Sequence, residues 1–140
     1  MSWLFWSLLS AVFAAATAIL AKRGVEKIDS NLATAIRTSV VVVFTWLMVV
    51  VTGTTVRGLS IGRKSWLFLT LSGLATGLSW LCYFRALKLG PASRVAPIDK
   101  LSVALVILFA ALLLGERLTW AKAVGGALIV TGAIVIALER

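Results

Sequence analysis

Five long apolar runs alternate with short polar segments along the chain. The runs cover residues 3–21, 32–52, 66–84, 96–114 and 119–138. Each is close to the roughly 20 residues that an α-helix needs to cross about 30 Å of hydrocarbon. Their continuous apolar character argues against a β-barrel, whose strands alternate apolar and polar residues. The pattern therefore predicts an all-α protein, an integral membrane bundle of five transmembrane helices.

The polar segments between the runs are too short to form a second domain, so we expect a single transmembrane domain over residues 1–140. The segment "GERLT" (115–119) predicts a tight helical hairpin. Gly115 suits the left-handed position after a helix, and Thr119 suits the cap of the next one.

The fourth run contains a purely apolar stretch that is too short to span a bilayer. Residues 101–114 number only fourteen, which is roughly 21 Å of helix. The helix is therefore expected to begin near residues 95–96, with Pro97 in its first turn, where proline is tolerated. Asp99 and Lys100 then lie inside the membrane or at its edge.

Two arginines are expected to lie near the same depth as this pair. Reaching full length puts Arg37 about a turn inside the second span, and Arg85 ends the apolar part of the third. Because five spans alternate in direction, both arginines and the pair Asp99 and Lys100 are expected towards one leaflet. A charge in mid-membrane costs about 3 kcal/mol, so such groups tend to pair or to line wet cavities. Asp99 can neutralise one of three cations, which favours an anionic or carboxylate-bearing solute.

Each of these residues also has a simpler interpretation. Arginine and lysine near span ends often extend their charged groups to the lipid headgroups. Asp99 in a first helical turn would be favoured by the helix dipole. Glu116 and Arg117 are either turn residues or a gating contact. Trp80 and Tyr83, in the third run, are candidates for stacking on a solute, with aromatic packing as the alternative.

Small residues recur at spacings typical of helix contacts in lipid. Gly73 and Gly77 form such a pair in the third run, and Gly125 and Gly132 lie two turns apart in the fifth. Small side chains let helix backbones approach closely where no hydrophobic effect drives association. These glycines are candidates for packing within one subunit or for a dimer interface.

Composition supports the membrane interpretation and excludes several chemistries. The chain is 61% hydrophobic and 14% charged, whereas a soluble domain is nearer half and a quarter. Most of the basic residues behind its net charge of +9 lie between the apolar runs, where such residues orient membrane proteins, and they form no nucleic-acid patch. With no histidine and one cysteine, Cys82, the sequence offers no metal site, cofactor motif or catalytic triad. We expect a non-enzymatic, multi-pass protein of the cell (inner) membrane.

The second half of the chain carries a familiar succession of motifs. A small-residue loop, Gly90 to Ser93, precedes Ala96-Pro97, an apolar helix, "LLGE" at 113–116 and a final span with Gly125 and Gly132. In this order the chain resembles the EamA family of the drug/metabolite transporter superfamily. Residues 18–38 also look like the join between the first two spans of short members.

The resemblance implies a transporter of metabolites, amino acids or drugs. Typical members have ten spans, in two five-span repeats of opposite orientation with the solute path between them, whereas this chain has one repeat. It also lacks an acid in its first span, where related small multidrug exporters carry a proton-coupling glutamate. Asp99 is the remaining acid near the membrane interior.

A lone repeat of an odd number of spans is expected to recruit a partner, because inverted repeats commonly build a midplane site at their interface. An antiparallel homodimer and pairing with a paralogous subunit are both open. The loop charges allow either, since six basic residues on one face oppose five on the other, too small a bias to set orientation. The first face carries Lys22, Arg23, Lys27, Lys88, Arg94 and Arg140, and the second Arg57, Arg63, Lys64, Arg117 and Lys122.

The sequence therefore predicts a dimeric secondary transporter that moves a small, anionic or zwitterionic metabolite by alternating access. Candidate residues for solute contact or gating are Arg37, Arg85, Asp99, Lys100, Trp80 and Tyr83. Two other functions stay open: a non-transporting accessory or scaffold subunit, and a flippase subunit for a lipid-linked headgroup.

Overall fold

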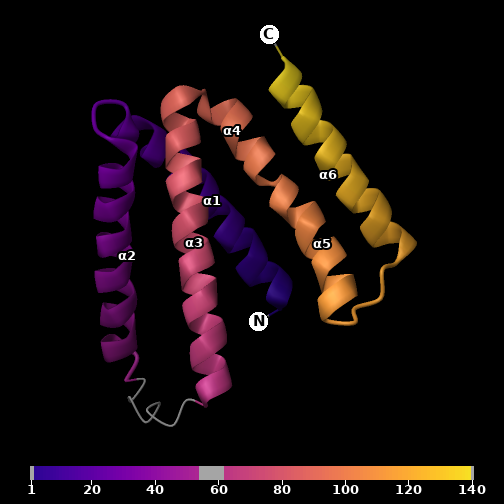
Figure 1. Cartoon of the computed structure of the whole chain (residues 1–140), viewed down its shortest axis with the longest axis horizontal. Coiled ribbons are helices and arrows are strands. Elements are labelled where there is room, and N and C mark those ends of the chain that lie inside the picture. Colours follow the sequence, from indigo (N-terminus) through magenta and orange to yellow (C-terminus); the bar gives the residue numbers. More distant parts are fainter. Residues whose placement is uncertain (1, 54–61, 140) are drawn as a thin grey trace. The chain divides into compact units, whose positions relative to one another are not determined.

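A computed structural model describes residues 2–53 and 62–139 of the chain (Figure 1). Two of the basic residues in the charge comparison, Arg57 and Arg140, lie outside this part. The helices in the described part are α1 (Trp3–Val25), α2 (Ser30–Val51), α3 (Arg63–Leu89), α4 (Ala92–Asp99), α5 (Leu101–Leu113) and α6 (Trp120–Leu138).

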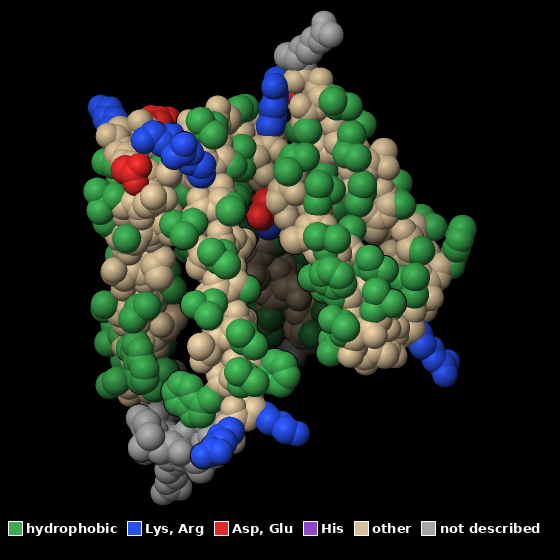
Figure 2. All heavy atoms as spheres, viewed as in Figure 1, with side chains coloured by type: hydrophobic (Ala, Val, Ile, Leu, Met, Phe, Trp, Pro, Cys, Tyr) green, Lys and Arg blue, Asp and Glu red, His purple; other side chains and the backbone are tan. Residues whose placement is uncertain are grey.

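The predicted all-α membrane fold is confirmed. In the described residues, five helical segments are long and apolar enough to cross a membrane, with α4 and α5 counting together as one segment, Ala92–Leu113. Large apolar side chains on these helices are mostly exposed, as is typical of helices whose solvent is lipid. In Figure 2 most charged side chains lie near helix ends, and hydrophobic side chains cover the flanks between them.

The helices extend beyond the apolar runs at the end where α1 meets α2. The first run ends at residue 21, but α1 continues through Lys22 and Arg23 to Val25. Asp29 then caps α2, because its carboxylate accepts hydrogen bonds from the backbone N–H groups of Asn31 (2.8 Å) and Leu32 (3.3 Å). Charged residues can therefore sit in the same helix as a span while lying beyond its apolar part.

The start of the fourth span differs from the sequence prediction. The helix begins at Ala92, directly after Pro91, and not near residues 95–96. Pro97 therefore lies inside α4 and not in its first turn. Proline has no N–H to donate and its ring crowds the carbonyl four residues earlier, so a helix that contains it bends or breaks nearby.

The break comes at Lys100, between α4 and α5. Its N–H is shared between the carbonyls of Ala96 (3.3 Å) and Pro97 (3.1 Å). Asp99 is consequently the last residue of α4, so the prediction that it occupies a first helical turn was wrong. A carboxylate there opposes the α4 dipole, and the compensation comes from the Lys100 ammonium, 3.2 Å away.

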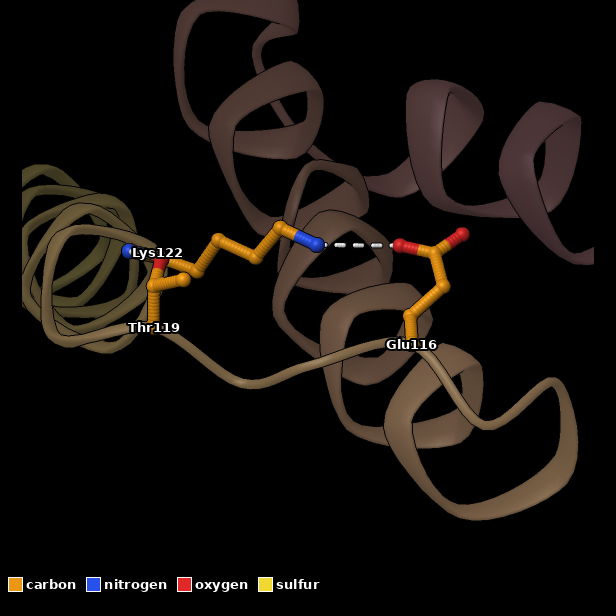
Figure 3. A network of polar contacts seen from close by, with 3 residues as sticks. All are labelled: Glu116, Thr119 and Lys122. Carbon is orange, nitrogen blue, oxygen red and sulfur yellow. Dashed lines mark hydrogen bonds and ion pairs between the residues drawn. The ribbon is translucent and has the colours of Figure 1, made fainter.

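The predicted hairpin between α5 and α6 is confirmed. Gly115 adopts a φ of 67°, the left-handed conformation that glycine accepts without strain. The Thr119 hydroxyl accepts a hydrogen bond from the Lys122 N–H (3.3 Å) and caps α6. Figure 3 shows the Lys122 ammonium reaching back to the Glu116 carboxylate, at 3.0 Å, so Glu116 stabilises the turn.

The chain divides into two compact units. The first comprises Met1–Lys22 with Leu89–Arg140, and the second comprises Arg23–Lys88. In the first unit, α6 packs against both α4 and α5. Gly126 of α6 lies against α5, because an added Cβ there would lie 3.4 Å from the side-chain atom Ile107 Cδ1. The single domain expected over residues 1–140 stays a prediction beside this division.

We predict that the Asp29 cap makes the stability of the protein depend on acid pH. Hydrogen bonds from the Asn31 and Leu32 N–H groups, aided by Lys88 and Arg85, hold the pKa of Asp29 below its usual 3.8. The stabilisation is therefore complete above that value and disappears as the pH falls through the lower, folded-state pKa. Melting temperatures in detergent should fall on acidification in the natural protein, whereas Asp29→Ser should keep a cap but lose this part of the pH dependence. Identical acid profiles for the two proteins would contradict the assignment.

Candidate functional site

Arg37 is an ionisable residue well inside a transmembrane helix. It is the eighth residue of α2, so its Cα lies roughly 10 Å along the helix from Ser30. The side chain is half-buried. It shares one helix face with Ser30 and Thr34, because residues at i, i+4 and i+7 lie above one another. Both of those side chains are buried.

The Arg37 guanidinium lies over the indole ring of Trp80 on α3. Its Cζ is 3.0 Å from the ring centroid, and 5.8 Å from the ring centroid of Phe84, one turn further along α3. Guanidinium groups stack on aromatic faces because the ring quadrupole attracts the cation and the planar group matches the ring. The two helices of the second unit thus meet through a cation–π contact.

The face of the Arg37 guanidinium has an aromatic partner, but one of the N–H donors in its plane has no hydrogen-bond acceptor. Nη1 is buried and has no hydrogen-bond partner. The five acidic residues of the chain offer it no carboxylate in its own unit's spans, because Glu26 and Asp29 lie in the α1–α2 connection. Arg37 is therefore a cation held by aromatic rings, with a donor available to an acceptor oxygen.

The remaining sequence candidates of the second unit lie along α3. Tyr83 is half-buried and lies three residues after Trp80 on α3. Arg85 is exposed, and its positive charge helps to lower the pKa of Asp29. Lys88 donates from Nζ to the carbonyl oxygen of Ile28, at 2.7 Å. Cationic groups therefore gather at the end of this unit where α2 starts.

Asp99 and Lys100 form an ion pair in the first unit. Their Nζ–Oδ2 distance is 3.2 Å, and the lysine side chain is about half exposed. Asp99 is the one acidic residue of the sequence that lies within a span. Since Arg37 and Arg85 belong to the second unit, the predicted cluster of all four charges stays a prediction.

The predicted glycine ridges face open space. An added Cβ on Gly73, Gly77, Gly125 or Gly132 would meet no atom of the described chain within 4 Å. The small residues in close packing on α6 are instead Gly126 and Ala133, which are buried. The assignment of the four predicted positions to a dimer interface stays a prediction.

Comparison with known proteins gives the family of the chain. A sequence model described as the EamA-like transporter family matches residues 1–138. The chain belongs to the EamA-like transporter family. This confirms the resemblance noted from the motifs between residues 86 and 138 and agrees with the five apolar helices of a multi-pass membrane protein.

Two relatives of this EamA-like transporter show further sequence similarity. A protein of Sinorhizobium sp, named "Uncharacterized transporter in cobO 3'region", is 53% identical over 137 residues, which cover 98% of this chain and 97% of the relative. A probable 4-amino-4-deoxy-L-arabinose-phosphoundecaprenol flippase subunit, ArnF, of Erwinia tasmaniensis is 47% identical over 72 residues, which cover 50% of this chain and 55% of the relative. No solved structure matches the chain.

Sequence reasoning missed three residues around Arg37 in this EamA-like protein. All three are buried. Phe84 is the last residue of the third apolar run, Ser30 lies in the loop before the second run, and Thr34 lies within that run. One signal was available: Ser30, Thr34 and Arg37 recur at i, i+4 and i+7, so they form a polar stripe on an apolar helix. The aromatic partner was not recognisable, since the pairing of α2 with α3 is tertiary.

We predict that the Arg37–Trp80 contact contributes to stability. Removing the ring in Trp80→Ala should cost about 1–2 kcal/mol beyond the loss of apolar packing, as expected for a desolvated cation–π pair. A double-mutant cycle with Arg37→Met, followed by thermal unfolding in detergent, isolates this coupling. Trp46→Ala, on the exposed side of α2, is the matched control and should show no coupling with Arg37→Met. Additive effects of Trp80→Ala and Arg37→Met would contradict the contact.

Proposed function

We propose that this EamA-like transporter moves a small, anionic or zwitterionic metabolite by alternating access, as a dimer of five-span units in the cell (inner) membrane. One observation supports this solute class. The Arg37 guanidinium of α2 stacks on the Trp80 ring of α3, and its Nη1 has no hydrogen-bond acceptor. A carboxylate or phosphate oxygen is the acceptor that suits a guanidinium best, because the pairing is charge-assisted and matches its fork of donors.

The energies involved favour a role in binding over a purely structural one. An arginine costs about 3 kcal/mol at the centre of a span on insertion scales, which is an upper bound for Arg37, the eighth of 22 residues in α2. The stacking on Trp80 offsets about 2 kcal/mol at most. An unpaired buried donor adds a penalty of about 1–3 kcal/mol, and more for a charged group. A solute oxygen at Nη1 would remove that penalty, so Arg37 is poised for differential binding of an anion.

The ion pair at the break in the fourth span provides a candidate gate. Broken helices in transporters place polar groups and helix ends at the solute path. Asp99 and Lys100 are adjacent in sequence and their bond is partly exposed, so an anion competing for Lys100 can open it. In this proposal Arg85 attracts the anion towards the end of the second unit, and Trp80 and Tyr83 shape the surroundings of Arg37.

The topology supports the proposed dimer. One repeat of five spans presents one half of the inverted-repeat arrangement that commonly builds a midplane site, so a second subunit is needed to complete it. Gly125 and Gly132 lie on α6 with open space beside them, which suits close contact with another helix. A homodimer is the simplest assembly, and a paralogous subunit would serve in the same way.

A flippase subunit for a lipid-linked headgroup is the second candidate function. It is favoured by the 47% identity to the ArnF flippase subunit, whose named substrate carries a phosphate-linked isoprenoid. Arg37 would then bind a phosphate at the end of a lipid. The two functions differ in the source of the anion, which is water for a metabolite and the bilayer for a lipid-linked headgroup.

We predict that binding of anions depends on Arg37. Thermal-shift measurements on purified protein with succinate, glutamate, inorganic phosphate and a polyprenyl phosphate should identify at least one stabilising anion. Arg37→Ala should abolish the shift, and Arg37→Lys should weaken binding by about tenfold or more, because lysine keeps the charge but loses the fork and the stack.

Arg63→Ala, at the exposed start of α3, is the matched control and should bind like the natural protein. Stabilisation by polyprenyl phosphate alone would favour the flippase function. If no anion shifts the melting temperature, or if Arg37→Ala binds normally, the proposed solute class is wrong and an accessory subunit becomes the better interpretation.

We predict that the open glycines of α6 support the dimer. Gly125→Leu and Gly132→Leu should lower the dimer fraction, measured by cross-linking in membranes, without lowering the thermal stability of the monomer, because no atom of the described chain lies within 4 Å of an added Cβ. Ala127→Leu, at another exposed position of α6, is the control and should leave the dimer intact. Unchanged dimer fractions in both glycine variants would place the interface elsewhere.

A further inference from the structure

We propose that the anion site of α2 has a second contact point, the hydroxyl group of Ser30, and that its solute carries acceptor oxygens at both ends, as a dicarboxylate does. This inference rests on the proposed function, because it uses Arg37 as the inner contact. It adds a residue that the function so far leaves unused, and it narrows the class of solute.

Ser30 is more deeply buried than any other polar residue in the described part of the chain. Its side chain and backbone together are 1% exposed, yet Oγ has no hydrogen-bond partner. Buried hydroxyl groups almost always find a partner, and leaving one unpaired costs about 1–3 kcal/mol. Ser30 and Arg37 hold the buried side-chain polar atoms without partners in the described residues, and they lie on one face of one helix.

The position of Ser30 explains why its hydroxyl is unpaired. Serine and threonine inside helices commonly donate to the carbonyl four residues earlier. Ser39 and Thr38 do this on α2, donating to the carbonyls of Ala35 (3.0 Å) and Thr34 (2.8 Å). Ser30 is the first residue of the helix, so the residue four positions earlier, Glu26, belongs to the preceding connection and offers no helical carbonyl.

The polar groups on this face are mainly donors. Thr34, between the two, already donates its hydroxyl proton to the Ser30 carbonyl at 2.8 Å. Arg37 can only donate, and Ser30 has a free hydroxyl proton that rotates towards an acceptor. The Cα atoms of Ser30 and Arg37 are seven residues apart, or roughly 10 Å along the axis. One solute with an acceptor group at each end would therefore satisfy both.

The charges near Ser30 also favour an acceptor at this end. Lys88 and Arg85 both help to lower the pKa of Asp29, the residue before Ser30, so two cations lie near one carboxylate. That carboxylate is already engaged by the N–H groups of Asn31 and Leu32. The net positive charge attracts a carboxylate or phosphate end and disfavours an ammonium end.

The experiment compares carboxylates of equal length with one or two acids. Binding of butyrate against succinate, and of valerate against glutarate, is measured by isothermal titration on the purified, lipid-reconstituted protein. In the natural protein we expect at least one dicarboxylate to bind about tenfold more tightly than its monocarboxylate, because the second acid reaches Ser30. Ser30→Ala should remove this advantage while leaving monocarboxylate binding, which uses Arg37, within about twofold.

Ser39→Ala is the matched control, since it removes an exposed hydroxyl from the same helix, and it should keep the full advantage. Ser30→Cys, of similar size with a weak donor, replaces Ser30→Ala if that variant does not fold. No dicarboxylate advantage in the natural protein, or an advantage that persists in the Ser30 variants, would overturn the inference. Monocarboxylate binding that depends on Arg37 would in that case leave the proposed function intact, whereas the absence of all carboxylate binding would remove both.

Discussion

The hydrocarbon core of the bilayer imposes the constraint on which the rest of this structure depends. It contains no water to satisfy backbone groups, so each crossing must be a helix of about 20 residues. The uninterrupted apolar stretches of the second and fourth spans, residues 38–52 and 101–114, are shorter than that, and their helices reach full length only by including polar residues at one end. The presence of Arg37 in α2 and of Asp99 and Lys100 in the fourth span follows directly. Function, on our proposal, uses charges that the length requirement brings into the membrane.

The two units compensate their charges in different ways. In the first, a carboxylate and an ammonium group on adjacent residues neutralise each other at 3.2 Å, at the helix break that lies three residues after Pro97. In the second, the described residues of α2 and α3 include no acid, and aromatic rings hold Arg37 instead. An ion pair is satisfied without a ligand, whereas a stacked guanidinium keeps donors in its plane. This difference is why the second unit is the better candidate for recognising an anion, and the first for gating.

Membership of the EamA-like transporter family and the geometry answer different questions. The family match and the 53% identical transporter establish the type of protein, and they carry no information about the solute of this chain. The unpaired donors of Ser30 and Arg37 point to a chemical class of solute through their own requirements. The flippase relative aligns with half of this chain. A phosphate would also supply the acceptor oxygen that Arg37 Nη1 lacks.

The sequence by itself determined the five spans, the hairpin at Gly115 and Thr119 and the family, because hydrophobic length, turn conformation and capping are local properties. It misplaced the start of the fourth helix, because proline was assigned to a first helical turn, whereas the helix begins at Ala92 and contains Pro97 in its interior. Only the tertiary structure paired Arg37 with Trp80 and Phe84, selected Gly126 over Gly125 for close packing, and left the Ser30 hydroxyl unpaired. These outcomes depend on which faces of separate helices meet, and the side chains that meet are distant in sequence.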